Sequence, residues 1–153
     1  MKKFLLIAIL FLLAGICIET NAQTFSGSIA NGTIKRGTAG RATIVMNIPR
    51  ELHVNSNRPD SEYAIPTSVR VTAPGLKVGT VMYPRGRNRK FEFSDNAINV
   101  YEGRVAFNFN VNVPANYRGN TIRVRAVVRY QACTNSVCYP PKNQDVILTA
   151  KVN

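Results

Sequence analysis

Two cysteines near the end of the chain are the residues whose type and spacing best suit chemistry. Cys133 and Cys138 have four residues between them and lie in the segment Tyr130-Gln131-Ala132-Cys133-Thr134-Asn135-Ser136-Val137-Cys138-Tyr139-Pro140-Pro141. Such a pair can form a disulfide that either staples the chain or exchanges with the thiols of another protein. A loop this short removes only about 2 kcal/mol of unfolded-state entropy, near the low end for disulfides. The pattern alone leaves stapling and redox activity both open.

The residues around the pair bear on whether its sulfurs are accessible. Two consecutive prolines, Pro140-Pro141, stiffen the chain after Cys138 and interrupt any regular strand there. If the alternation of residues 122–130 continues, Cys133 lies with Gln131 on the polar face of its strand, away from the core. We therefore expect Cys133 to be exposed, which is a condition for thiol exchange.

Metal or cofactor chemistry finds little support in the sequence. The chain has a single histidine, His53, and only Cys133 and Cys138 accompany it once the N-terminal segment is removed. One imidazole and two thiolates make a poor set for a tetrahedral metal site, so we expect no metal and no bound cofactor. His53 is best interpreted as a hydrogen-bonded structural residue.

The first residues have the order expected of a secretory signal peptide. Two lysines precede an apolar run, Phe4–Ile18, which is followed by a small residue, Ala22. That run is shorter than the roughly 20 apolar residues that span a bilayer as a helix. We therefore expect residues 1–22 to be cleaved, leaving residues 23–153 as a single periplasmic or secreted domain without stable membrane insertion. Cys17 leaves with the signal, and the remaining pair meets an oxidising compartment.

Alternation of apolar and polar residues dominates the remaining chain. This period of two, broken by turn signals such as Asn31-Gly32 and Ala73-Pro74-Gly75, is typical of antiparallel strands that bury one face. No stretch has the apolar spacing of an amphipathic helix. The pattern predicts an all-β fold, an immunoglobulin-like antiparallel β-sandwich of about seven strands. The alternating stretches are residues 105–113, 122–130 and 146–152, with weaker ones at 42–48, 68–72 and 77–83.

The chain is strongly basic, with 20 Lys and Arg against 8 Asp and Glu and a net charge of +12. Several arginines, including Arg123, Arg125 and Arg129, fall on the polar face of one predicted strand. No aromatic residues alternate with them as a base-stacking platform requires, so we expect no nucleic-acid partner. The basic face is interpreted as a solvated surface that discourages edge-to-edge pairing, or as one that steers an acidic protein partner. We expect a monomer.

The cysteine segment also resembles a known family. The run from Tyr130 to Pro141 is similar to the active-site segment of the N-terminal periplasmic domain of the thiol:disulfide interchange protein DsbD. Weaker motifs in the expected order extend the resemblance over roughly residues 45–150. The resemblance implies an immunoglobulin-like sandwich that relays electrons by disulfide exchange. The weaker motifs are His53–Pro59, Ile65–Thr67, Tyr83-Pro84 and Val100–Gly103.

The resemblance implies roles for individual residues. Cys138 would be the attacking thiol that forms a mixed disulfide with a thioredoxin-fold partner, and Cys133 would resolve that bond. A cap segment, Phe91-Glu92-Phe93, would shield the pair until a partner docks, with Phe93 preferred as the shielding ring. Ordinary core packing is the alternative for both phenylalanines. The residues expected to surround the pair are Tyr130, Gln131, Tyr139 and Pro140.

Two departures from the family accompany this resemblance. Four residues separate the cysteines here and five in well-known members, so loop geometry and redox potential can differ. The family protein continues into a transmembrane electron conduit and a thioredoxin-like domain, so we expect a membrane electron donor to act in trans.

The predicted function is periplasmic thiol–disulfide exchange through Cys133 and Cys138, as a component of a protein-disulfide reductase system. Electrons would pass through the pair to thioredoxin-fold proteins. The alternative is a non-catalytic immunoglobulin-like binding module with a structural disulfide, for which a reduction potential below about −300 mV is expected.

Overall fold

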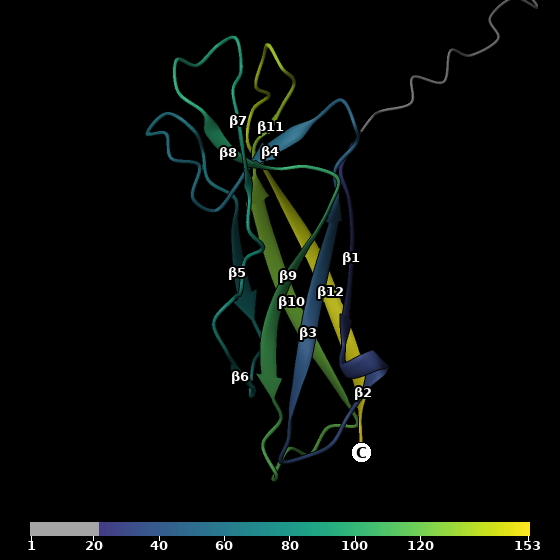
Figure 1. Cartoon of the computed structure of the whole chain (residues 1–153). Helices are drawn as coiled ribbons and strands as arrows, with labels where there is room; N and C mark the ends of the chain where they lie inside the picture. Colours follow the sequence, from purple (N-terminus) through teal and green to yellow (C-terminus); the bar gives the residue numbers. More distant parts are fainter. Residues whose placement is uncertain (1–21) are drawn as a thin grey trace, which may run out of the picture.

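The structure is a β-sandwich with a third, smaller sheet at one end (Figure 1). This computed structural model describes residues 22–153, so the predicted signal peptide lies outside the described residues except for Ala22. Within that range the only helical element is a 3-10 turn, η1 (Ala30–Gly32). No helix of the described range is long and apolar enough to cross a bilayer.

One layer of the sandwich is a four-stranded antiparallel sheet in the order β1-β3-β9-β6. Its strands are β1 (Thr24–Ile29), β3 (Ala39–Asn47), β9 (Arg104–Asn112) and β6 (Lys77–Val78). β9 forms a one-sided strand because apolar residues from Val105 to Val111 recur at every second position and are buried. Ile44 of β3 faces Phe107 of β9 on this inner side.

The facing layer has the order β2-β12-β10-β5, in which β2 and β12 are parallel and the other pairs antiparallel. Its strands are β2 (Thr33–Ile34), β12 (Lys142–Val152), β10 (Thr121–Tyr130) and β5 (Ser68–Thr72). β10 alternates between buried and more exposed residues along its whole length, and β12 does so from Asp145 onward. Their ladder runs from Thr121 opposite Lys151 to Tyr130 opposite Lys142.

A continuous apolar core fills the space between the two layers. Phe107 and Phe109 of the first sheet belong to the same buried cluster as Ile122 and Leu148 of the second. The layers also approach closely at β1, where a Cβ atom on Gly27 would lie 2.9 Å from Leu148. Burial of this apolar surface is the main force that holds the sandwich together.

A small antiparallel sheet, which we call the end sheet, closes one end of the sandwich in the order β11-β4-β8-β7 (Figure 1). Its strands are β11 (Ala132–Cys133), β4 (His53–Asn55), β8 (Ile98–Tyr101) and β7 (Arg87–Arg89). Only Gln131 separates β10 from β11, so the chain passes directly from the sandwich into the end sheet. A separate small cluster of Phe91, Ile98 and Val100 is buried here.

The predicted antiparallel β-sandwich is confirmed, and the stretches predicted at 105–113 and 122–130 match β9 and β10 closely. The strand predicted at 77–83 is wrong in extent, because only Lys77–Val78 forms a regular strand. Val78 faces Val111, but the next contact is an isolated bridge from Met82 to Asn108. The register has shifted by one residue between these contacts, as a β-bulge does.

Candidate active site

Cys133 and Cys138 form a disulfide at the edge of the end sheet, with an Sγ–Sγ distance of 2.03 Å. Cys133 ends β11, and Cys138 returns opposite it as an isolated antiparallel bridge. Between them, the amide of Thr134 donates to the carbonyl oxygen of Val137 at 2.8 Å, and its hydroxyl oxygen accepts from the amide of Val137 at 3.1 Å. The pair therefore closes a short turn within residues 131–141, which we call the cysteine hairpin.

The two cysteines differ in exposure. Cys133 is 0% exposed, whereas Cys138 is exposed. The expectation that Cys133 lies on the exposed polar face is therefore wrong. The alternation of β10 ends at Gln131, because the chain leaves the sandwich there and both Ala132 and Cys133 become buried in the end sheet. Accessibility for thiol exchange is supplied by Cys138 instead.

His53 is the cross-strand neighbour of Cys133 in the end sheet. Its side chain is buried, and its Nε2 atom has no hydrogen-bond partner among residues 22–153, so the hydrogen bond expected of a structural histidine is missing at this atom. Burial lowers the pKa of His53, Glu102 raises it in part, and Arg89 lowers it. Arg89 and Glu102 form an ion pair with 3.4 Å between Nε and Oε1. The net lowering keeps the imidazole neutral at pH 7.

The connection between β7 and β8 carries the predicted cap segment, Phe91-Glu92-Phe93. The ring of Phe91 is buried and stacks on that of His53, with 4.1 Å between the centroids. The ring of Phe93 stacks in turn on Phe91 at 5.3 Å and is 43% exposed. Phe91, not the preferred Phe93, thus lies against the cross-strand neighbour of Cys133, and the shielding role of either ring stays a prediction.

The cap segment and the cysteine hairpin border one another. Asn135, between the two cysteines, lines the same hollow of about 410 Å³ as residues 88–92. This hollow is open to solvent and contains the exposed Glu92. The strands that lead into the two segments, β11 and β7, lie at opposite edges of the end sheet, so the cap segment reaches across the sheet to meet the hairpin.

The residues predicted to surround the pair lie around the base of the hairpin. Tyr130 is buried in the sandwich core, and burial raises the pKa of its hydroxyl group. The Gln131 amide donates to the carbonyl oxygen of Tyr139 and accepts from the Asn55 amide, both at 3.2 Å. Tyr139 and Pro140 are exposed. Gln131 therefore ties the two ends of the hairpin to β4.

Comparisons with known proteins place this site within a family. The family model for the N-terminal domain of the thiol:disulfide interchange protein DsbD matches residues 26–150. The match includes both layers of the sandwich, the end sheet and both cysteines. The chain belongs to the DsbD N-terminal domain family. The chain has the immunoglobulin-like sandwich fold of that family. Members of the family are components of thiol:disulfide interchange proteins.

Individual relatives are more distant. The DsbD protein of Actinobacillus pleuropneumoniae is 24% identical in an alignment of 152 positions, which covers 97% of this chain and 24% of that protein. The N-terminal periplasmic domain of ScsB from Proteus mirabilis shares the fold, with a TM-score of 0.56 and 11% identity over 86% of this chain and 47% of that one. The reduced N-terminal domain of DsbD from Neisseria meningitidis has a TM-score of 0.47 and 19% identity. The alignment covers 72% of this chain and 80% of that one.

An apolar groove of about 450 Å³ adjoins the cysteine hairpin of this DsbD N-terminal domain. Three residues predicted to surround the pair, Tyr130, Tyr139 and Pro140, line it together with Leu52 and Thr134. Leu52 directly precedes His53, so the groove and the buried imidazole are contributed by adjacent residues. The exposed cysteine thus has an apolar surface beside it.

Three residues near the pair were not predicted as site residues. Asn55 fixes the hairpin through Gln131, while Glu102 and Arg89 set the electrostatic field at His53. Asn55 and Glu102 do occur in the motifs on which the family resemblance was based. Their connection to the cysteines depends on strand pairing, which those motifs do not specify.

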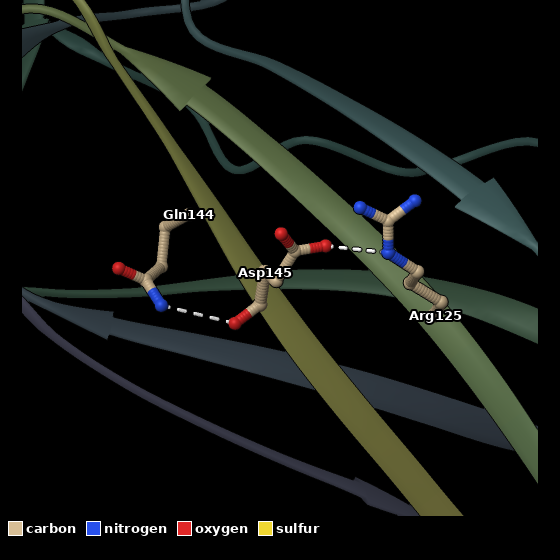
Figure 2. Close-up of polar contacts among 3 residues, drawn as sticks. All are labelled: Arg125, Gln144 and Asp145. Atoms are coloured by element: carbon tan, nitrogen blue, oxygen red, sulfur yellow. Dashed lines mark hydrogen bonds and ion pairs between the residues drawn. The ribbon is translucent and has the colours of Figure 1, made fainter.

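The basic face lies on the sandwich and not at the disulfide. Arg123, Arg125 and Arg129 all lie on the exposed side of β10, as predicted. Figure 2 shows Arg125 reaching Asp145 of β12, with 2.6 Å between Nε and Oδ1. The Gln144 side chain donates to the backbone oxygen of Asp145 at 3.0 Å. These three arginines therefore belong to the surface of the sandwich sheet, whereas Arg89 lies beside His53.

Proposed function

We propose that this protein is a periplasmic thiol–disulfide exchange domain that passes electrons through Cys133 and Cys138 to thioredoxin-fold partners. The disulfide carries the proposal, because it joins one exposed and one buried cysteine within a DsbD N-terminal domain. The bond links two positions of a single hairpin and does not connect the layers of the sandwich. It is therefore poorly placed to act as a staple and well placed to open.

The exposed Cys138 is the proposed attacking residue. Its thiolate attacks one sulfur of the partner's disulfide, which forms a mixed disulfide and releases the other partner sulfur as a thiolate. Cys133 then loses its proton and attacks the Sγ atom of Cys138. The Cys133–Cys138 bond forms, and the partner leaves as a dithiol after protonation. Two electrons have moved from the domain to the partner.

The cap segment and the apolar groove are proposed to control access to the pair. Phe91 and Phe93 form a stack that begins on His53 and reaches the surface, next to the hairpin. A partner that competes for this apolar contact can move the outer ring aside. The groove beside Tyr139 and Pro140 offers the partner a second apolar contact on its way to Cys138.

The reduced pair must be regenerated after each turnover. We assign this to a membrane electron donor that acts in trans, since the predicted signal sequence would export the chain to the periplasm. The proposal requires no cofactor on the domain itself, because the electrons reside in the two thiols. Neither a nucleic-acid partner nor oligomer formation enters the proposed reaction.

The test is a measurement of reduction potential on the folded domain. The protein is equilibrated in dithiothreitol and glutathione redox buffers, free thiols are quantified by alkylation and mass, and circular dichroism is recorded in each buffer. We expect a potential above about −300 mV, within the range of exchange-active disulfides, with the fold retained when the bond opens. A potential below that value would instead identify a binding module with a structural disulfide.

A further inference from the structure

The end sheet places an imidazole beside the buried sulfur. Cys133 of β11 faces His53 of β4 in antiparallel register, and Cys133 is also bridged to Cys138. Directly opposed residues in such a sheet point to the same face, with their Cβ atoms about 4.5–5.5 Å apart. His53, Cys133 and Cys138 therefore form a row across the sheet.

The same register extends the row to a carboxylate. Val54 of β4 faces Tyr101 of β8, so the preceding residue, His53, comes opposite the following one, Glu102. The charge of this carboxylate raises the pKa of His53 in part. Arg89 of β7 opposes this effect and pairs with Glu102. The carboxylate, the imidazole and the thiol thus lie side by side across neighbouring strands.

His53 is in the state that a proton acceptor needs. Its Nε2 atom is buried and unpaired within the described chain, and Phe91 holds the ring plane by stacking. Burial dominates the charged neighbours and lowers its pKa, so the ring is neutral at the pH of the reaction. Neutral imidazole with an open nitrogen can take up a proton.

Cys133 is the residue that needs such an acceptor. It is fully buried, and a thiolate buried among apolar atoms is disfavoured unless a neighbouring group takes its proton. Cys138 is exposed and can lose its proton to water. Only the second, resolving step of the exchange therefore calls for a base within the protein.

We propose that His53 accepts the thiol proton of Cys133 in the resolving step, and that the charge of Glu102 stabilises the imidazolium that forms. This inference rests on the proposed thiol–disulfide exchange. As the proton moves to His53, the Cys133 sulfur attacks the Cys138 sulfur of the mixed disulfide. The Cys133–Cys138 bond forms, the bond from Cys138 to the partner breaks, and the partner sulfur leaves with the electron pair. The imidazolium then returns its proton to that thiolate or to water.

The experiment isolates the resolving step without a protein partner. Reduced protein is mixed with 5,5′-dithiobis(2-nitrobenzoate) in a stopped-flow instrument. The first release of the coloured thiolate reports labelling of Cys138, and the second, which is independent of reagent concentration, reports resolution by Cys133. The pKa of His53 is measured separately by NMR on the mixed disulfide of a Cys133→Ser variant, where the single histidine of the chain gives one imidazole signal.

We expect the wild-type resolution rate to rise with pH and level off at the pKa measured for His53. In His53→Gln, and in His53→Phe, which keeps a ring to stack on Phe91, resolution at pH 7 should fall about a hundredfold. In both variants, the resolution rate should continue to rise with pH and show no plateau, because Cys133 must ionise without a base. The first phase should be unchanged.

Glu102→Gln gives a second, finer readout. Loss of the carboxylate lowers the pKa of His53, so the plateau should begin at a lower pH than in the wild type. Glu62→Gln, an exposed carboxyl elsewhere in the chain, is the matched control and should leave the profile unchanged. The inference is overturned if His53→Phe resolves at the wild-type rate, or if both His53 variants keep the plateau. A failure of the protein to exchange with thioredoxin-fold partners would leave this two-phase assay intact and would count against the proposed function only.

Discussion

The sandwich and the end sheet of this domain are built in different ways. The sandwich has strands of up to 11 residues, such as β12, and one large core. The end sheet has strands of two to four residues. It contributes Val54, Tyr101 and Ala132 to the sandwich core, and its own cluster consists of Phe91, Ile98 and Val100. Local stability follows buried contacts, so the end sheet should open at a lower free energy than the sandwich. The reactive pair therefore lies where a partner can displace segments while the body stays folded.

The largest contrast is expected between the two cysteines themselves. Cys133→Ser should trap a thioredoxin-fold partner as a stable mixed disulfide, because the resolving thiol is missing. Cys138→Ser should trap little, because the remaining thiol is buried. Non-reducing gels after incubation with an oxidised thioredoxin-fold protein measure both. Equal trapping by the two variants would contradict the assignment of Cys138 as the attacking residue.

Truncation of the sandwich core should affect stability alone. Phe107 is fully buried between the layers, so Phe107→Ala should lower the free energy of unfolding by about 3–5 kcal/mol. Urea denaturation measures this change, and the redox potential of the protein that remains folded should match the wild type. A shifted potential would show that the core couples the two regions, since Phe107 contacts Tyr101 of the end sheet with 6.0 Å between ring centroids.

Opening the disulfide should have a smaller effect on stability. The bond closes a short loop, so reduction should lower the free energy of unfolding by no more than about 2 kcal/mol. Thermal unfolding with and without dithiothreitol should give one cooperative transition in both cases. Loss of that transition on reduction would make the bond a structural staple.

Removal of the outer cap ring should change access more than stability. Phe93 is partly exposed, so Phe93→Ala should shift the free energy of unfolding by less than about 1 kcal/mol. Oxidation of the reduced pair by small-molecule disulfides should become faster, with a smaller change for a protein partner. Phe91→Ala, which uncovers His53, should speed oxidation further. If Phe93→Ala instead destabilises the domain and leaves oxidation unchanged, the ring is a packing residue.

The smallest effect is expected on the basic face. Arg125 and Asp145 are both more than half exposed, and exposed ion pairs contribute about 0–1 kcal/mol. Asp145→Asn should therefore change the free energy of unfolding only slightly and leave the redox potential unchanged. A clear shift in potential would bring the sandwich surface into the site.

The sequence predicts the sandwich better than the end sheet for a physical reason. β9 and β10 bury one face each, so their alternation identifies them without knowledge of their partners. β4 buries all three of its residues, His53, Val54 and Asn55, and shows no alternation at all. Strands this short are defined by pairing with distant segments, which no local pattern records.

The candidate site follows the same division. The cysteines and the cap segment could be found from sequence, because their residues form motifs that resemble a family. The burial of Cys133 could not, because it depends on the chain leaving β10 after Gln131 to join another sheet. The row from Glu102 through His53 to Cys133 likewise exists only through the register of three strands.

The two ends of the cysteine hairpin are fixed at a single step of the sandwich ladder. Tyr130 at the last position of β10 faces Lys142 at the first position of β12, and residues 131–141 leave and return between them. An insertion or deletion inside this excursion shifts neither strand against the other. The spacing of the cysteines, and with it the affinity of the pair for electrons, can therefore change without any change in the register of β10 against β12.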